Sequence, residues 1–331
     1  MKKLVFSTSI LGASHIRNKK PCQDYSIVWL SDDSDTAVLI VCDGHGSDTY
    51  VRSDVGARLA GEITLDCVRR FLLPFNGIKP DSEWIIGTKG AVTSREEDVK
   101  MRYSKLKPKD EKDMTETDWM RYRQRLEFRE QIKDKYEQDA IFQALFGSVY
   151  EKWLDAIQLD SLKNPFTDEE KELIGKHELK KAYGTTLMTY VQTPEYWFAF
   201  QIGDGRMLAC DEKSQWRQIV PWDIACFQNQ TTSLCSSSPI PKFRYAFDGT
   251  GCFPRAVFCC SDGIEDSYGD YDVAPENLHN YFTGLLKVFT EEGKESTMSK
   301  LEEFLPKLSA AGSKDDMSIA GIINNITKEQ Q

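Results

Sequence analysis

The chain has 331 residues, and its 40% hydrophobic content is normal for a folded protein with one large domain or two small ones. With 42 Lys and Arg residues against 52 Asp and Glu residues, the formal net charge is -10. This charge argues against broad electrostatic attraction to nucleic acid or to an anionic membrane. We therefore expect neither as a partner.

The nine cysteines form no CxxC pair and no Cys/His cluster of zinc spacing, so neither a disulfide framework nor a structural zinc site is indicated. The apolar run near the start, LVFSTSILGAS, imitates a signal peptide, but its Ser-Thr-Ser interruption is more typical of a strand. No stretch approaches the roughly 20 apolar residues of a membrane span. We expect a protein of the reducing cytoplasm.

The first part of the chain reads as strands, turns and one helix. Strands are expected at about residues 4–11, at 25–30 and at 36–42. The third strand ends in the loop Asp43-Gly44-His45-Gly46, and an amphipathic stretch from about 48 to 71 predicts a helix. A short apolar run that ends abruptly in an acid and two glycines is typical of a strand that delivers a loop to a site.

The middle of the chain has a different character. Residues 96–139 are dense in Lys, Arg, Glu and Asp with aromatic residues between them, which predicts exposed helices. We interpret about 80–139 as a solvated helical insertion within a single domain of residues 1–331. A nucleic-acid surface is the alternative, and the mixed charge signs disfavour it.

Short β-type runs return in the last part of the chain, separated by turn residues, with one helical stretch among them. The strands are expected at 185–191, 197–202, 206–210, 256–260 and 317–323, and the helix at about 275–308. Mainly antiparallel strands with helices inserted between them predict an α+β layered fold.

Three aspartates share one setting, an apolar β-type run next to a tight turn. They are Asp43, Asp262 and Asp315. Acids at strand ends can converge when the strands lie side by side, and carboxylate oxygens are the ligands that Mg²⁺ and Mn²⁺ prefer. Taken singly, each acid is better explained as a turn residue.

Taken in order, the motifs resemble the PPM or type 2C metal-dependent protein phosphatases, and more closely their bacterial-type branch. The resemblance covers about residues 4–75 and 180–323. It rests on Ser14-His15, Pro21-Cys22-Gln23-Asp24, Asp43-Gly44-His45-Gly46, Gly184-Thr185-Thr186, Gly203-Asp204-Gly205-Arg206, Ser261-Asp262-Gly263 with Asp266, and Gly312-Ser313-Lys314-Asp315-Asp316-Met317-Ser318.

This resemblance implies an enzyme that hydrolyses phosphoserine and phosphothreonine in proteins, with phosphoprotein substrates of a serine/threonine kinase. It implies two Mn²⁺ or Mg²⁺ ions, both bound by Asp43 and one also by the Gly44 carbonyl. Asp262 and Asp315 would hold the other ion, and Asp24 would act through water bound to the metal. The implied fold is a β-sandwich of two antiparallel sheets flanked by helices.

His45 is the candidate general acid. Hydrolysis of a phosphomonoester leaves an alkoxide that needs a proton, and His45 lies two residues after Asp43, where the resemblance places that role. The alternative is a plain turn residue. The ions would neutralise the phosphate and lower the pKa of water.

A third, weaker metal site is suggested by the resemblance, with Asp204, Asp262 and Asp266 as its acids. If a helix begins at Asp262, the i,i+4 spacing places Asp262 and Asp266 on one face. The alternative is that Asp204 closes a hairpin turn and Asp266 caps the following segment.

Three positions depart from the family pattern. Gln23 stands where the family usually has Glu, and Asp316 stands in place of Asn. Lys19 stands where a phosphate-binding Arg is usual, and Arg17 is the alternative contact; a lysine binds phosphate as a point charge and not as a bidentate fork.

Three other interpretations stay open. One is a catalytically silent PPM-like module that binds phosphoproteins, and another is a hydrolase of small phosphate esters. The third is an unrelated scaffold with coincidental Asp-Gly turns. Retention of Asp43, Asp262 and Asp315 favours an active enzyme.

Overall fold

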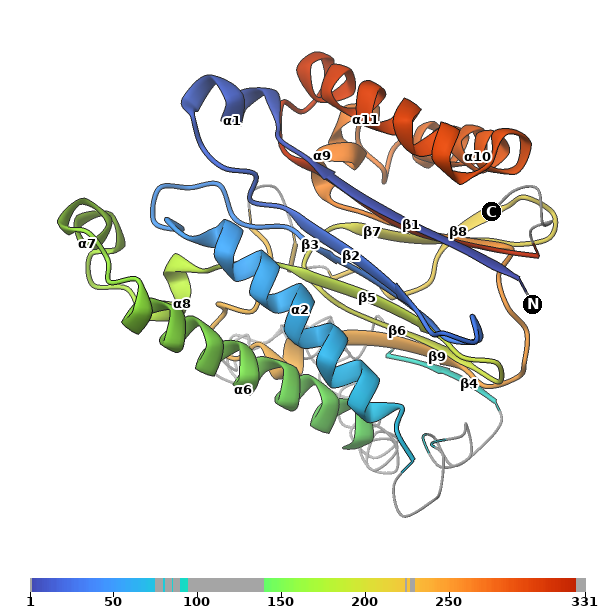
Figure 1. The fold of residues 1–331 in the computed structure, drawn as a ribbon, viewed down its shortest axis with the longest axis horizontal. Coiled ribbons are helices and arrows are strands. Elements are labelled where there is room, and N and C mark those ends of the chain that lie inside the picture. The colour runs from blue at the N-terminus through green and yellow to red at the C-terminus, as the bar shows by residue number, and fades with distance from the viewer. Residues whose placement is uncertain are drawn as a thin grey trace, which may run out of the picture.

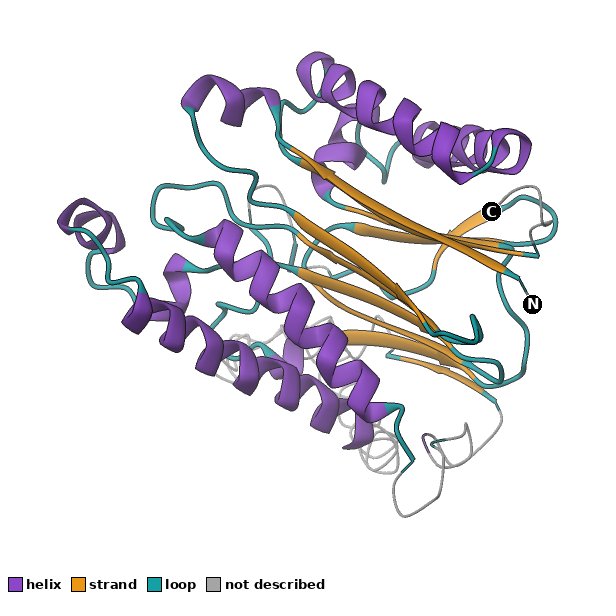
Figure 2. Cartoon of the chain, in the orientation of Figure 1, coloured by secondary structure: helices purple, strands orange, loops and turns teal. Residues whose placement is uncertain are grey.

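The computed structural model describes residues 2–74, 80, 85, 90–94, 140–223, 225–226 and 230–325. Two antiparallel sheets lie face to face in the middle of the molecule, and helices cover the outer face of each (Figure 1). The same four layers can be followed by secondary structure in Figure 2. The prediction of an α+β fold with two antiparallel sheets and flanking helices is therefore confirmed.

One sheet has five strands and joins the two ends of the described chain. Its strands, in spatial order, are β1 (Lys3–Ile10), β11 (Met317–Asn324), β10 (Ala256–Cys260), β7 (Arg206–Cys210) and β8 (Trp216–Gln218). The last strand, β11, lies between β1 and β10, with Lys3 opposite Asn324 and Cys260 opposite Ile319.

The other sheet has six strands among the described residues, all paired antiparallel. In spatial order they are β2 (Tyr25–Leu30), β3 (Ala37–Cys42), β5 (Leu187–Gln192), β6 (Trp197–Ile202), β9 (Arg244–Asp248) and β4 (Ala91–Thr93).

The central strands are apolar along their whole length because both of their faces are covered. Every residue of β3, AVLIVC, is buried, as is every residue of β5 and β6. Between the sheets, Leu39 and Val41 of β3 belong to one cluster with Val257 of β10 and Ile322 of β11. Burial of such residues on both faces supplies the main driving force for this layered arrangement.

Two pairs of helices close the outer faces. Helices α2 (Ser53–Phe71) and α6 (Ala140–Lys163) lie side by side over the six-stranded sheet, and α10 (Pro275–Glu292) and α11 (Lys294–Ala311) lie over the other (Figure 1). The ring of Phe142 in α6 stacks on Tyr245 of β9 with centroids 4.7 Å apart. Two short helices, α7 (Asp168–Ile174) and α8 (Leu179–Ala182), follow α6.

The structure differs from the sequence prediction in several elements. Helix α1 (Ala13–Asn18) lies where a polar loop was expected, and strands β8 and β9 were not predicted. The helix expected at 275–308 is two helices, because Gly293 adopts φ 79, a left-handed conformation that ends α10.

Most of the predicted insertion at about 80–139 lies outside the described residues. Within its limits, residues 91–93 form strand β4, which pairs with β9. Among the helices of the described residues, none is long and apolar enough to cross a membrane.

Candidate functional site

The register of the six-stranded sheet brings two of the predicted acids to one end. Asp24 immediately precedes β2 and Asp43 immediately follows β3. The strand residues next to them, Tyr25 and Cys42, are paired partners. Antiparallel pairing therefore places both carboxylates at the same end of this sheet.

The five-stranded sheet brings further acids to its corresponding end. Asp262 is the first residue of α9 (Asp262–Glu265), directly after β10 and Ser261, and Asp315 lies two residues before β11. Since Cys260 of β10 pairs with Ile319 of β11, the end of one strand lies beside the start of the other. Asp204 lies in the turn that leads from β6 in one sheet to β7 in the other.

Backbone contacts hold the Asp43–Gly44 segment in position. The Asp43 carbonyl accepts hydrogen bonds from the Thr186 amide at 2.8 Å and the Thr185 hydroxyl at 3.0 Å. The Asp43 amide donates to Thr186 Oγ1 at 3.1 Å. A Cβ on Gly44 would lie 2.4 Å from the Gln23 carbonyl oxygen, so only glycine fits there. The Gly-Thr-Thr motif thus supports the Asp-Gly-His-Gly loop.

The buried acids raise one another's pKa. Burial first, then the charges of Asp262, Asp24 and Asp204, hold the pKa of Asp43 well above its ordinary value. Burial, followed by the charges of Asp204 and Asp315, raises the pKa of Asp262 to about 7. Clustered carboxylates favour either protons or cations.

Asp24 has the same character. Burial is the largest cause of its raised pKa, which a hydrogen bond from Ser261 partly offsets and the charges of Asp316, Asp262 and Asp315 increase. Its Oδ2 atom is buried and has no hydrogen-bond partner among the described residues. A buried carboxylate oxygen without a donor suits a cation or a bound water.

The donor chemistry fits divalent cations, because carboxylates at the strand ends raise one another's pKa. In the part of the chain that the structure describes, however, no three His, Cys, Asp or Glu side chains are arranged as a metal-binding group.

His45 lies against Tyr50 and over Gly184. Its ring centroid is 4.6 Å from that of Tyr50 in an edge-on arrangement, and its amide donates to the Gly184 carbonyl at 3.2 Å. A Cβ on Gly184 would lie 2.7 Å from the imidazole Cδ2 atom. Burial, and then the charge of Lys181, lowers the pKa of His45 to about 4, so the imidazole is neutral near pH 7.

The two basic residues expected to contact phosphate are exposed, Arg17 on α1 and Lys19 directly after it. The next residue, Lys20, reaches the loop after Asp43. Its ammonium donates to the Gly46 carbonyl at 2.9 Å and lies 3.4 Å from Asp48 Oδ1. The sequence alone does not distinguish Arg17, Lys19 and Lys20, because all three are basic and lie within four positions. The contact of Lys20 with the Gly46 carbonyl becomes visible only in the structure.

Asp316 is buried and ties three segments together. Its Oδ1 accepts from the Gly12 amide at 2.6 Å, and its Oδ2 accepts from the Gln23 amide at 2.6 Å. Oδ2 also lies 2.8 Å from His15 Nδ1. The sequence left open whether this acid aids metal binding or forms a turn, and its oxygens are occupied by these three nitrogens.

Asp262 and Asp266 lie within one continuous helical segment, since α9 is followed directly by the 3₁₀ turn η3 (Asp266–Tyr268). Burial is the largest cause of the raised pKa of Asp204, which Arg244 lowers and Asp266 raises. The Arg206 side chain binds Glu265 Oε1 at 2.7 Å and so ties β7 to α9.

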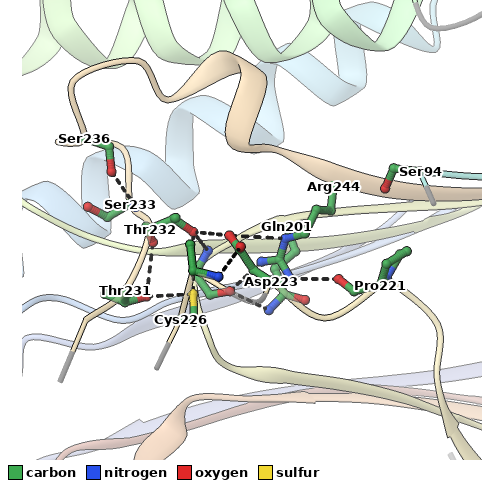
Figure 3. A network of polar contacts seen from close by, with 12 residues as sticks. Ser94, Gln201, Pro221, Asp223, Cys226, Thr231, Thr232, Ser233, Ser236 and Arg244 are labelled. Atoms are coloured by element: carbon green, nitrogen blue, oxygen red, sulfur yellow. Dashed lines mark hydrogen bonds and ion pairs between the residues drawn. The ribbon is translucent and has the colours of Figure 1, made fainter. Parts of the chain in front are cut away.

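A polar network holds the turn that carries Asp204 (Figure 3). Thr232 Oγ1 accepts from the Gly203 amide at 3.1 Å and donates to Asp223 Oδ2 at 2.8 Å. Arg244 donates to the Gly203 and Pro221 carbonyls and lies 3.8 Å from Asp223. The turn is therefore held from β9 and from the segment around Asp223.

Solved structures share this fold at low sequence identity. PppA of Pseudomonas aeruginosa, titled a key regulatory component of T6SS, has a TM-score of 0.50 and 13% identity, with 98% of each chain covered. A C. elegans sex determining protein has a TM-score of 0.50 and 12% identity over 100% of this chain and 67% of that chain. The Mycobacterium tuberculosis serine/threonine phosphatase PstP/Ppp has a TM-score of 0.49 and 13% identity, over 98% of this chain and 99% of that chain.

No curated protein matches this chain. Residues 11–306 match the family model described as Protein phosphatase 2C. That span takes in the motifs from Ser14 to Asp266 and every described strand except β1 and β11. With a match of this extent and with the acids of both sheets at one end of the sandwich, the chain belongs to the protein phosphatase 2C family.

Proposed function

We propose that this protein is an active protein phosphatase that hydrolyses phosphoserine and phosphothreonine in other proteins with two Mn²⁺ or Mg²⁺ ions. The observation that supports the proposal is that Asp24, Asp43, Asp262 and Asp315 each lie next to a strand end, and that burial and neighbouring acids raise the pKa of the first three. A purely structural role for this cluster is costly, because like charges without a cation repel one another.

The ions would be held by Asp43, the Gly44 carbonyl, Asp262 and Asp315, with Asp24 contributing through water. Divalent ions bound there supply Lewis acidity that neutralises a phosphate dianion and activates water. The Thr185 and Thr186 contacts hold the Asp43 backbone, and with it the start of the loop that carries Gly44.

Lys20 is proposed to bind a phosphate oxygen in place of Lys19 or Arg17. Its ammonium already lies at the Gly46 carbonyl, on the loop that begins with Asp43. As a point charge with three donors, it can exchange the exposed Asp48 carboxylate for a phosphate oxygen.

His45 is proposed to deliver a proton to the leaving serine or threonine oxygen. The neutral imidazole first takes up a proton, and a phosphate dianion bound nearby raises its pKa and so favours that uptake. The edge-on contact with Tyr50 orients the ring.

Two further proposals concern the location of the protein and a third metal ion. We place the protein in the cytoplasm, which is consistent with nine cysteines that all carry free thiols. We also propose a third ion near Asp204, Asp262 and Asp266; the alternative is that Asp204 closes a turn and Asp266 caps the following segment.

Hydrolysis of a phosphothreonine peptide is the decisive test, measured with Mn²⁺, after chelation and after Mn²⁺ is restored. The expected result is activity that is lost on chelation and recovered with metal. Activity that survives chelation would contradict the metal-dependent proposal. Peptide binding without turnover would instead identify a silent phosphoprotein-binding module, and turnover of small esters alone would identify a different substrate class.

A further inference from the structure

Helix α8 carries two neighbouring lysines with different surroundings. Lys180 donates to the Ser236 carbonyl at 3.1 Å and pairs with Glu178 at 3.1 Å. Lys181 is half-buried, and its ammonium lies 4.5 Å from the centre of the Tyr50 ring. Among the described residues no carboxylate lies within ion-pair distance of Lys181, and Tyr50 is the main group that favours its charge.

Lys181 is connected to the candidate general acid by two routes. Through side chains, the Tyr50 ring under the ammonium packs against His45 with centroids 4.6 Å apart. Through the backbone, the Gly184 amide donates to the Lys181 carbonyl at 3.3 Å, and the Gly184 carbonyl accepts from His45. The charge of Lys181 is also felt at the imidazole, where it lowers the pKa.

Burial disfavours the Lys181 ammonium, but the contacts with Tyr50 and the charge of Cys235 outweigh burial and raise its pKa, so Lys181 carries a positive charge at neutral pH. A carboxylate of the substrate would supply the ion-pair partner that the described residues do not provide. The ammonium lies on the His45 side of the site, where the proposed mechanism puts the serine or threonine oxygen and therefore the peptide that carries it.

We propose that Lys181 is a specificity-determining residue that binds an acidic side chain of the substrate peptide close to the phosphorylated residue. The inference rests on the proposed phosphatase activity. An extended peptide advances roughly 3.3 Å per residue, so a carboxylate one or two residues away lies within reach of a flexible lysine. Lys180 lacks this role because Glu178 already neutralises it.

The test compares two phosphothreonine peptides that differ only in the flanking residues, Glu on both sides in one and Gln in the other. The readout is the ratio of their kcat/KM values, measured for the wild type and for Lys181→Met, Lys181→Glu, Lys181→Arg and Lys180→Met. Using the ratio cancels any general effect of a substitution on folding or on His45.

We expect the wild type to prefer the Glu peptide by about five- to tenfold, mainly through a lower KM, and less so at high salt. Lys181→Met should reduce the ratio to about one and Lys181→Glu should bring it below one. Lys181→Arg should keep most of the preference, and Lys180→Met should match the wild type.

A wild-type ratio near one, or a preference that Lys180→Met abolishes as strongly as Lys181→Met, overturns the proposal. Hydrolysis of an aryl phosphate by the wild type separates the two levels of inference. If neither peptide nor aryl phosphate is hydrolysed, the proposed function fails; if both are hydrolysed without charge preference, only the role of Lys181 fails.

Discussion

Replacing Asp316 by Asn tests how much the buried carboxylate contributes to folding. The wild-type oxygens face the Gly12 amide, the Gln23 amide and His15 Nδ1 at 2.6–2.8 Å. Asn has one acceptor oxygen and one amide nitrogen of almost the same shape. If the oxygen faces Gln23 and His15, the new NH₂ group faces the Gly12 N–H donor, and that amide loses its partner.

The cost can be estimated from these contacts. One buried donor without a partner costs about 1–3 kcal/mol, and hydrogen bonds to a charged acceptor contribute about 1.5–3 kcal/mol compared with about 1 kcal/mol for neutral ones. We therefore expect Asp316→Asn to lower the free energy of unfolding by about 2–4 kcal/mol.

Urea unfolding of the metal-free protein, followed by circular dichroism, measures this difference without a contribution from bound cations. The matched control is Asp315→Asn, which changes the neighbouring exposed carboxylate and should shift stability by less than about 0.5 kcal/mol. Equal urea midpoints for the two variants would refute the argument that Asp316 ties these segments together.

Four further predictions concern the acids and the histidine. Asp43→Asn and Asp262→Asn should each abolish peptide hydrolysis in a protein that still folds, and near-normal turnover at saturating Mn²⁺ would contradict the proposed ligand roles. The pKa of Asp262 rises from 3.8 to about 7 on folding, so the folded state loses stability as pH increases between these values. The metal-free wild type should therefore melt at a lower temperature at pH 8 than at pH 5. Asp262→Asn should reduce that difference. His45→Gln should slow phosphothreonine peptides at least tenfold more than an activated aryl phosphate, since only the peptide's leaving oxygen needs a proton; equal losses would assign His45 an orienting role. Asp204→Ala and Asp266→Ala should lower turnover while calorimetry still detects two tight ions if a third ion matters, whereas turn and cap roles predict lower stability with unchanged turnover per folded molecule.

The strands and their acids were predictable because their signals are local. Runs such as AVLIVC before Asp43 and AVFCC before Asp262 are buried on both faces, so they are apolar throughout and stand out from the sequence. The order of motifs then led to the family, and the two-sheet fold follows from it.

The missed features depend on tertiary contacts. Strand β9 begins with Arg244, and a charged residue does not predict a buried strand. Its burial depends on its contacts with Asp223 and the Gly203 carbonyl, which the sequence does not show. Helix α1 has six residues and buries only His15, too little for a helical pattern. Lys20 and Asp316 gained their contacts from segments far away in the chain, which no local pattern reveals.

The position of β11 has a consequence for biosynthesis. Among the described residues this strand is the last, yet it lies inside its sheet between the first strand and β10, and Asp315 lies two residues before it. A nascent chain therefore cannot complete the five-stranded sheet, or bring Asp315 to the other acids, until residues up to 324 have left the ribosome. Such long-range pairing slows folding and leaves strand edges open meanwhile. Chains terminated before β11 should accordingly be inactive and prone to aggregation. Truncated chains would then not dephosphorylate other proteins.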